Sequence, residues 1–294
     1  MTKTYSIFHV EGGLGKHVAA TAVAKCIKNN HPDRELIVVC SYPEIFLSLD
    51  YVNKVYRHGS TPYFYDTYID GVDSLIFKHE PYFTTEHIHK KLPLIENWCK
   101  LYNLEFNGET PEIVFNMRNK QFGENFWRRP KPIMVIQTNG GPMEGQKFPY
   151  SWSRDIPYSL AQKIVDHYSL RFHVIQICRH EANALSGAEV INQPLSNMEL
   201  FSLLMVSKKN ILIDSCLQHA AAAMNKPSVV LWVGTSPKVF GYDIHTNLVA
   251  DIPKSLSLPD SYLFDFSFNG EIHECPFLED NFFTLAEIIE AVKE

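Results

Sequence analysis

The chain has 294 residues, which predicts two compact domains rather than one, because a domain usually contains about 100–200 residues. Hydrophobic residues make up 45% of the composition and charged residues 20%, which excludes a mainly disordered protein. The formal net charge is -6, so the chain lacks the basic excess that non-specific nucleic-acid binding requires.

The six cysteines form no Cys-x-x-Cys pair, a pattern typical of reduced thiols in the cytoplasm. No positively charged and apolar leader opens the chain, and no apolar run reaches the ~18 residues that a membrane span needs. We therefore expect a cytoplasmic protein without a secretion signal or a transmembrane segment, while peripheral membrane association stays open.

The first elements predict a parallel βαβ unit. Residues 5–10 form a predicted strand, Gly12-Gly13-Leu14-Gly15 a turn, and the following residues to about 30 a helix with one apolar side. The next strand, residues 36–40, is apolar on both faces, as strands of a parallel sheet covered by helices are. Any ligand should bind beyond the carboxyl ends of these strands.

The segment from Ser41 to Leu104 is rich in aromatic residues. The elements predicted here and just after it are strands at 51–56, 74–78 and 113–115 and one helix at 86–102. Tyr63 and Tyr65 are candidates for stacking on an acceptor sugar, although a place in the core is the commoner explanation for aromatic side chains.

The alternation of strands and helices restarts further along the chain. The predicted strands are 133–137, 172–177, 189–191, 210–213 and 228–233, and the predicted helices are 159–168, 197–206, 217–224 and 285–293. Thr284 and Glu287 form a capping box for the last helix. The pattern predicts an α/β fold with two Rossmann-like, doubly wound parallel-sheet lobes and a cleft between them.

The domain limits follow from the same pattern. We place the N-terminal lobe at 1–120, a linker at 121–131 and the C-terminal lobe at 132–294. The linker is predicted where glycine, arginine and proline residues interrupt the alternation. For the last helix, packing back on the first lobe is an alternative.

The glycine turn alone is a weak functional signal. Its glycines permit positive φ and let a ligand approach the backbone, and the next helix offers free N–H groups to an anion. Val18 stands where a dinucleotide fingerprint has its third glycine, and His17 where a P-loop has Ser or Thr. A tight turn without a ligand is therefore the alternative.

A more specific block lies in the second lobe, where an apolar strand leads into Asp214, Ser215 and Cys216. The amides at the start of the next helix form an anion-binding geometry, and His219 could donate to a diphosphate. The alternative is that Asp214 only caps the helix and that His219 is a surface residue. The four consecutive alanines at 220–223 let this helix approach a neighbour closely.

This block, followed by a proline, an apolar strand and Gly234-Thr235-Ser236-Pro237, resembles the donor-binding signature of the lipopolysaccharide heptosyltransferases. These are glycosyltransferases with two Rossmann-like lobes, the GT-B fold. Their glycine turn also follows the first strand, and the resemblance extends loosely over most of the chain. It implies transfer of a heptose-like sugar from a nucleotide diphosphate, ADP- or GDP-linked, to a hydroxyl of a glycan, lipid or protein.

The resemblance also implies roles for single residues. Asp214, Ser215 and Cys216 would hold the donor's phosphates and sugar, and His219 would contact the diphosphate. The other donor-side positions that it implies are Gly12, Gly13 and Gly15 in the first turn, Thr138, Asn139 and Gly140 in the loop that opens the second lobe, Lys147 at the leaving diphosphate, Arg179 and Glu181 at the ribose and Leu195 beside the base.

Two residues depart from the family's pattern. Lys16 stands where the family has the aspartate taken as general base, and a lysine, with an ordinary pKa of ~10.4, is a poor base at pH 7. Lys16 would bind an anionic acceptor or diphosphate, or be a solvated lysine at a helix start. Glu11, or else His9, is then the expected base. Cys216 replaces a glycine, so either the loop needs no positive φ or the sugar pocket is narrower.

We therefore expect a glycosyltransferase with Glu11, Lys16 and Lys147 as its catalytic residues. No cofactor and no metal ion are expected, because the sequence shows no Asp-x-Asp motif and no histidine pair with ligand spacing. Two alternatives stay open. One is a homologue that binds nucleotide sugars or acts as a scaffold, which Lys16 favours, and the other is a nucleotide-sugar epimerase on the same fold.

Overall fold

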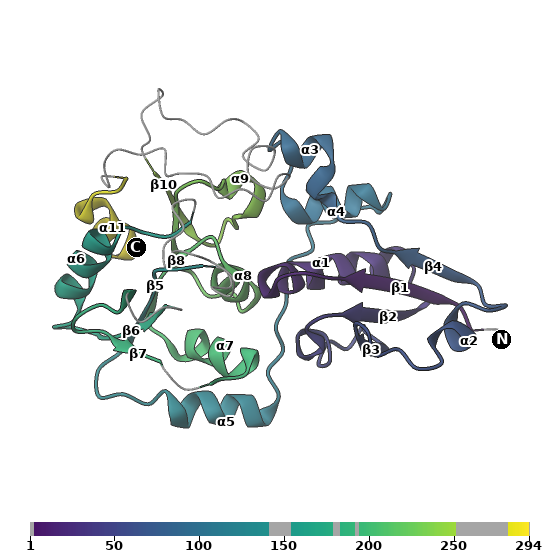
Figure 1. The fold of residues 1–294 in the computed structure, drawn as a ribbon, viewed down its shortest axis with the longest axis horizontal. Coiled ribbons are helices and arrows are strands. Elements are labelled where there is room, and N and C mark those ends of the chain that lie inside the picture. The colour runs from purple at the N-terminus through teal and green to yellow at the C-terminus, as the bar shows by residue number, and fades with distance from the viewer. Residues whose placement is uncertain (1–2, 141–153, 179–182, 192–193, 251–281, 294) are drawn as a thin grey trace.

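Two lobes lie side by side in the computed structural model (Figure 1). The structure describes residues 3–140, 154–178, 183–191, 194–250 and 282–293. Each lobe contains a sheet in which the strand pairs are parallel, with helices on both faces. The predicted α/β fold with two doubly wound lobes is confirmed.

The first lobe has a four-stranded sheet in the order β3-β2-β1-β4. Its strands are β1 (Tyr5–Val10), β2 (Glu35–Cys40), β3 (Lys54–Arg57) and β4 (Ser74–Phe77). Alternate residues of β1 face opposite sides of the sheet. Phe8 and Val10 therefore share a core with α1 (Leu14–Asn30), while Tyr5 and Ile7 pack against the side of α2 (Phe64–Tyr68).

The single helix predicted at 86–102 is wrong. The structure has two short helices there, α3 (Thr85–Ile88) and α4 (Leu94–Leu101). Between them Lys90 has a φ of 53°, and Pro93 precedes the first residue of α4. Both interrupt a helix, because a left-handed residue leaves the helical path and a proline lacks the N–H that the helix needs.

The strand predicted at 113–115 is also absent from the described structure. Ile113 and Phe115 pack against the apolar core without pairing with a strand, which explains their apolar character. Just before them, the Glu112 N–H donates a hydrogen bond to Thr21 Oγ1 at 2.8 Å. This stretch is therefore held along α1 as irregular chain.

The segment predicted as a linker, 121–131, begins inside a helix. This helix, α5 (Met117–Phe126), packs on α7 (Asn197–Val206) of the second lobe. The Trp127 indole that follows it donates a hydrogen bond to Ser202 Oγ at 3.0 Å. Of the residues that suggested a linker, Gly123 is buried in α5 against α7, and Arg128, Arg129 and Pro130 follow the helix, so the chain crosses between the lobes before α5.

The second lobe has a six-stranded sheet in the order β10-β9-β8-β5-β6-β7. Its strands are β5 (Ile133–Gln137), β6 (His173–Ile177), β7 (Glu189–Val190), β8 (Lys209–Ile213), β9 (Val229–Trp232) and β10 (Thr246–Val249). Its helices, besides α7, are α6 (Tyr158–Tyr168), α8 (Cys216–Ala223), α9 (Pro237–Phe240) and α11 (Leu285–Lys293). The predicted elements of this lobe are confirmed, each within one residue of its expected limits, and β10 and α9 were not predicted.

The last helix packs on the second lobe, so the alternative of a return to the first lobe is wrong. Ile288 and Val292 share a core with Ile211 of β8 and Leu231 of β9. The predicted cap is present, because the Glu287 N–H donates to the Thr284 hydroxyl. The apolar stripe of α11 thus covers the same sheet face as α6.

Among the described residues, no helix combines the length and the apolar character needed to cross a membrane.

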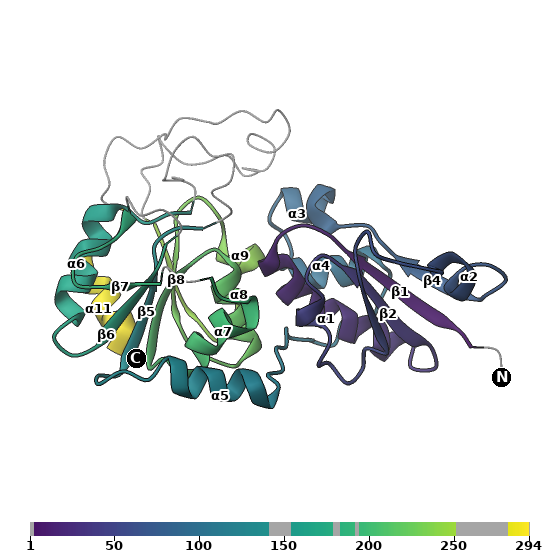
Figure 2. The same ribbon diagram turned by 60° about the horizontal axis from the view of Figure 1, so that its bottom comes forward.

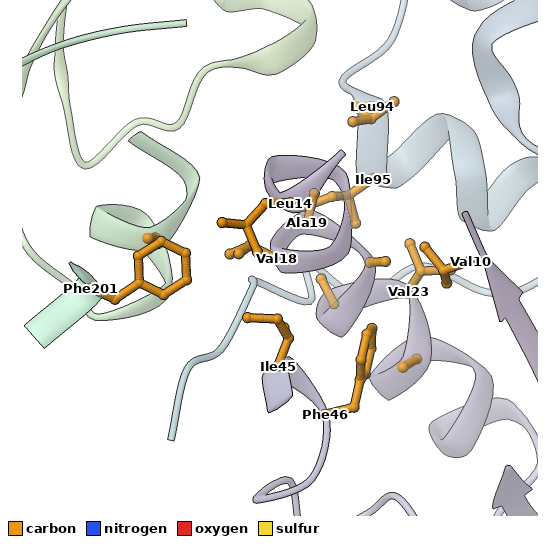
Figure 3. Packing of buried hydrophobic residues seen from close by; sticks show 14 of the residues in the cluster. Val10, Leu14, Val18, Ala19, Val23, Ile45, Phe46, Leu94, Ile95 and Phe201 are labelled. Atoms are coloured by element: carbon orange, nitrogen blue, oxygen red, sulfur yellow. The ribbon is translucent and has the colours of Figure 1, made fainter. Parts of the chain in front are cut away.

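One apolar core runs through both lobes. Figure 3 shows Leu14 and Val18 of α1 facing Phe201 of α7. All three side chains are buried, and they belong to the same cluster as Leu217 of α8. In both ribbon views α1 reaches from the first sheet to α8 (Figures 1 and 2). The lobes are therefore joined by packed side chains as well as by the chain itself.

The backbones of the two lobes approach each other closely at Gly15. A Cβ built on Gly15 would lie 3.1 Å from Cys216 Cα and 2.9 Å from His219 Cδ2. The alanine run of α8 continues this contact, since Ala220 and Ala221 are fully buried in the shared core. The expectation that this helix approaches a neighbour closely is confirmed.

Replacing Gly15 should therefore destabilise the protein. We expect Gly15→Ser to lower the free energy of unfolding by about 1–3 kcal/mol, because the added side chain meets backbone atoms that cannot move aside freely. Gly13→Ser is the matched control, since a Cβ there meets nothing within 4 Å and serine is a favoured residue at the start of a helix. Urea unfolding of both variants checks this, and equal stabilities would contradict it.

Candidate functional site

The glycine turn of the first lobe meets the start of α8. Gly12 has a φ of 90°, which favours glycine, and turns the chain from β1 into α1. Gly13 stands at the N-cap of α1, where open space surrounds its Cα. Gly15 faces Cys216 and His219. The turn and the second-lobe block, far apart in sequence, are thus neighbours.

His17 fixes the backbone of this turn. Its Nδ1 lies 2.9 Å from the Gly13 carbonyl oxygen, and its Nε2 lies 3.2 Å from the Val10 carbonyl oxygen and 3.1 Å from the Ser41 nitrogen. Burial lowers the pKa of His17, so the ring is neutral at pH 7. In the sequence His17 only marks the absence of a P-loop, and no local signal indicates this role.

Lys16 forms an ion pair with Glu80, so its interpretation as a solvated lysine is wrong. Its Nζ lies 2.6 Å from Glu80 Oε1, and the Lys16 side chain is only 14% exposed. The same Nζ lies 5.2 Å from the centre of the Tyr82 ring. Glu80 follows β4, which ends at the same edge of the sheet as β1. That edge position was the signal that could have identified Glu80.

Glu11, the expected base, lies beside two histidines. Its Oε1 is 3.5 Å from His9 Nδ1 and 3.9 Å from His58 Nε2. About half of the Glu11 side chain is exposed. Desolvation lowers the pKa of His9. The turn therefore carries a carboxylate that is separate from the Lys16 pair and open to solvent.

The second-lobe block lies at the carboxyl end of β8. Asp214 is 4% exposed, and its Oδ2 lies 3.8 Å from Arg154 Nε. The N-cap of α8 is Ser215 and not Asp214, so the alternative in which Asp214 only caps this helix is wrong. Cys216 is the first residue of α8 and has helical backbone geometry. Of the two explanations for cysteine in place of glycine, the structure therefore supports the one in which no positive φ is needed.

His219 is buried, so its interpretation as a surface residue is also wrong. Its Nδ1 lies 2.7 Å from the Tyr242 hydroxyl. Burial lowers the pKa of His219 to about 4, although the nearby Asp214 carboxylate acts in the opposite direction. Burial also raises the pKa of Tyr242. Tyr242 follows α9, in a stretch whose sequence shows no periodic pattern, and it was not predicted.

The loop after β5 is held by a buried aspartate. Asp155 accepts hydrogen bonds from the Asn139 side-chain amide and from the Gly140 N–H, both at 3.0 Å. Thr138 Oγ1 accepts another from Gln176 at 2.9 Å. A Cβ built on Gly140 would lie 3.7 Å from Ser215 Cβ. The three loop residues are thus fixed next to the Asp214–Cys216 block, and Asp155 was missed by the sequence analysis.

Leu195 lies just before the N-cap of α7 and packs against the apolar core. Next to it, Asn197 donates a hydrogen bond to Glu44 of the first lobe at 2.7 Å. This side of the second lobe therefore also contacts the first lobe. Lys147, Arg179 and Glu181 lie outside the described residues.

A cavity of about 500 Å³ lies between the lobes. It is lined by His219 and Tyr242 from the second lobe, and by the start of α4, Phe106 and residues 108–112 from the first. None of the other predicted donor-binding residues within the described ranges lines this cavity. It is therefore not the donor pocket that the sequence predicts.

Tyr63 and Tyr65 are strongly exposed, at 82% and 64%, so a place in the core is wrong for these two. They belong to α2 and its N-cap, at the end of the first lobe far from the second (Figures 1 and 2). The ring of Tyr68 in the same helix lies 4.9 Å from that of Tyr5, the first residue of β1. Tyr63 and Tyr65 therefore lie near the opposite end of β1 from the glycine turn and do not border the predicted site.

No protein-family model matches the sequence, and no curated protein matches it. The fold is similar to that of a glycosyltransferase of family 9 from Veillonella parvula, with a TM-score of 0.69, 11% identity, and coverage of 99% of this chain and 96% of that one. For ADP-heptose lipopolysaccharide heptosyltransferase II of E. coli, the TM-score is 0.63, the identity 13%, and the coverage 87% and 93%.

A third similar structure is the dodecameric iron-containing heptosyltransferase TibC in complex with ADP-D-β-D-heptose. Its TM-score is 0.58 and its identity 16%, and the match covers 83% of this chain and 63% of that one. These likenesses show the fold. The two-lobed GT-B architecture that the sequence predicts is thus confirmed by its likeness to structures of a family 9 glycosyltransferase and a heptosyltransferase.

The buried neutral His219 predicts a pH dependence of stability. Its pKa rises from about 4 in the folded chain to its ordinary 6.5 on unfolding, so the unfolded chain binds an extra proton between these values. The free energy of unfolding should therefore fall as the pH is lowered through this window. His219→Asn should reduce that slope, as measured by urea unfolding at about pH 7, 6 and 5.

His89→Asn is the control for this measurement, because the His89 side chain is exposed and takes no part in the core. It should keep the pH dependence of the unchanged protein. An unaltered slope in His219→Asn would contradict a neutral buried imidazole at this position.

Proposed function

We propose that the chain is a glycosyltransferase that moves a sugar from a nucleotide diphosphate to a hydroxyl group of a glycan, lipid or protein. The observation that carries the proposal is the meeting of the glycine turn with Cys216 and His219 at the start of α8, directly after Asp214 and the N-cap Ser215. This occurs in a chain whose fold matches that of a family 9 glycosyltransferase over nearly its whole length. The E. coli relative is described as using ADP-heptose, so an ADP-linked heptose-like donor is the first candidate and a GDP-linked one the second.

The donor diphosphate is proposed to lie at the start of α8. Helix N-termini favour anions, because their first N–H groups lack partners within the helix. His219 would add one N–H as a neutral donor. Among the described residues Thr235 Oγ1, at the carboxyl edge after β9, is buried and has no hydrogen-bond partner, so it could bond to a phosphate oxygen.

Charge on the departing diphosphate would then be stabilised by protein groups rather than by a bridging metal ion. In this proposal Lys147 neutralises the leaving group. Lys16 lies in the first lobe, at the start of α1 directly after the glycine turn. Preorganised donors of this kind supply much of the rate enhancement in group-transfer enzymes. The remaining donor contacts would come from Thr138, Asn139 and Gly140, from Arg179 and Glu181 at the ribose, and from Leu195 at the base.

Glu11 is proposed as the general base. It would take the proton of the acceptor hydroxyl as that oxygen bonds to the sugar's anomeric carbon and the diphosphate leaves. The half-exposed Glu11 carboxylate is open to an acceptor, whereas Glu80 is paired with Lys16. We propose that the reaction takes place in the cytoplasm, where a lipid acceptor would bring the protein to a membrane surface.

Donor binding can be tested directly. ADP, GDP, UDP and their sugars should be compared by thermal shift, since a ligand that binds only the folded state raises its stability. We expect an ADP or GDP compound to bind. Asp214→Asn should raise the dissociation constant of that compound at least tenfold, as measured by calorimetry. Asp243→Asn, an exposed acidic position in the same lobe, is the control and should bind normally. Equal affinities in both variants would remove Asp214 from the donor site.

A catalytically impaired nucleotide-sugar-binding protein is the second candidate, favoured by the Lys16–Glu80 ion pair. The two candidates differ in what two variants should do. In the enzyme, Glu11→Gln should reduce turnover by about 10²–10⁴-fold without loss of donor binding. In the impaired protein, the unchanged chain is inactive, and Lys16→Asp with Glu80→Gln should gain turnover.

Glu80→Gln is needed in the double variant because Lys16→Asp alone would place the new carboxylate beside that of Glu80. Turnover is measured as nucleotide release in the presence of glycan acceptors. A wild-type chain that turns over donor at a rate unaffected by Glu11→Gln would contradict the role of Glu11 as the base.

A further inference from the structure

Three potential metal ligands meet at the carboxyl edge of the first sheet. They are His9 at the end of β1, Glu11 in the glycine turn and His58 after β3, and one ligand atom from each lies within 4.8 Å of the others. His9 Nε2 is 3.1 Å from His58 Nδ1, and Glu11 Oε1 is 3.5 Å from His9 Nδ1. Within the described residues no other group of three such side chains comes this close.

The backbone holds two of the three residues firmly. His9 pairs with Val39 in the middle of the sheet. The His58 N–H donates to the Cys40 carbonyl at 2.8 Å, and a turn closed by a hydrogen bond from Ser60 to Arg57 follows. Gly59 in that turn has a φ of 78°, which favours glycine. His58 thereby reaches across the end of β2 toward His9.

The separations suit a single ion. Metal–ligand distances of about 2.0–2.2 Å at tetrahedral or octahedral angles place ligand atoms about 2.8–3.6 Å apart. The contacts of 3.1, 3.5 and 3.9 Å use both ring nitrogens of His9 and of His58, whereas an ion takes one nitrogen from each ring. One ligand atom from each of the three side chains lies within 4.8 Å of the others, so rotations of the exposed side chains would close this set around an ion. The side chains of Glu11 and His58 are each 49% exposed, and that of His9 is 16% exposed. An ion could therefore be reached from solvent and keep open positions.

We propose that His9, Glu11 and His58 bind a divalent transition-metal ion of the Zn²⁺ type. Two imidazoles and one carboxylate are a common protein ligand set for such ions, with the remaining positions filled by water or a substrate oxygen. The site lies on the first lobe and includes Glu11, the proposed general base, but metal binding there does not depend on glycosyl transfer. With the ion bound, Glu11 is a ligand and no longer a free base.

The test uses the full chain after removal of metal with a chelator, and Co²⁺ as a spectroscopic probe. We expect one Co²⁺ per chain, with a visible spectrum of nitrogen and oxygen ligands and no thiolate-to-metal band, and one equivalent of Zn²⁺ by calorimetry. His58→Asn and Glu11→Gln should each weaken binding at least tenfold. Both positions are half exposed, so these variants should fold.

His89→Asn, at an exposed histidine of the same lobe, is the control and should bind like the unchanged chain. Three results would overturn the proposal: no stoichiometric binding, thiolate ligation, or full affinity in His58→Asn. Because no nucleotide or acceptor is present, failure here is distinguishable from failure of the proposed transferase activity.

Discussion

The architecture depends on the apolar contact between α1 of the first lobe and the helices α7 and α8 of the second. Leu14 and Val18 pack with Phe201 and Leu217 in one continuous core. Because this contact begins at the first residues of α1, it fixes the glycine turn against the start of α8. Apolar packing therefore brings the two halves of the candidate site together, while hydrogen bonds of His17 and Asp155 fix the loops within each lobe.

Around this contact the polar groups divide into two sets. The second-lobe set is mostly buried and satisfied within the protein, as Asp155 and the His219–Tyr242 pair illustrate. The first-lobe set, with Glu11 and His58, is more exposed. A rigid frame on one side and accessible side chains on the other suit a protein that binds one ligand in a fixed pose and meets a second from solvent.

The sequence predicted the second lobe well because its signals are local. Buried strands such as β5 are continuous apolar runs, and α7 carries its own capping box. The first lobe was harder, because the break between α3 and α4 depends on one left-handed residue and one proline within an apolar pattern. α5 was mistaken for a linker because only a narrow side of it is apolar.

The places of the glycine turn and of Asp214 at the ends of their strands were predictable, but the partners of the polar side chains were not. Parallel strands end at one edge of their sheet, so residues that follow them gather there, as the glycine turn does on the first sheet and Asp214 on the second. Which partners they find depends on distant parts of the chain. Nothing local connects Lys16 with Glu80, 64 residues away, or His9 with His58, 49 residues away. Asp155 and Tyr242 were missed for the same reason.

The shared core also limits how ligands reach the site. Pulling the lobes apart would expose Leu14, Val18 and Phe201, at roughly 1.5–3 kcal/mol for each large apolar side chain. Full separation is therefore rare at equilibrium. Ligands must enter along the polar edge while the apolar contact stays closed, so the hinge of any domain motion lies at α1 and α8 rather than in the connecting chain alone.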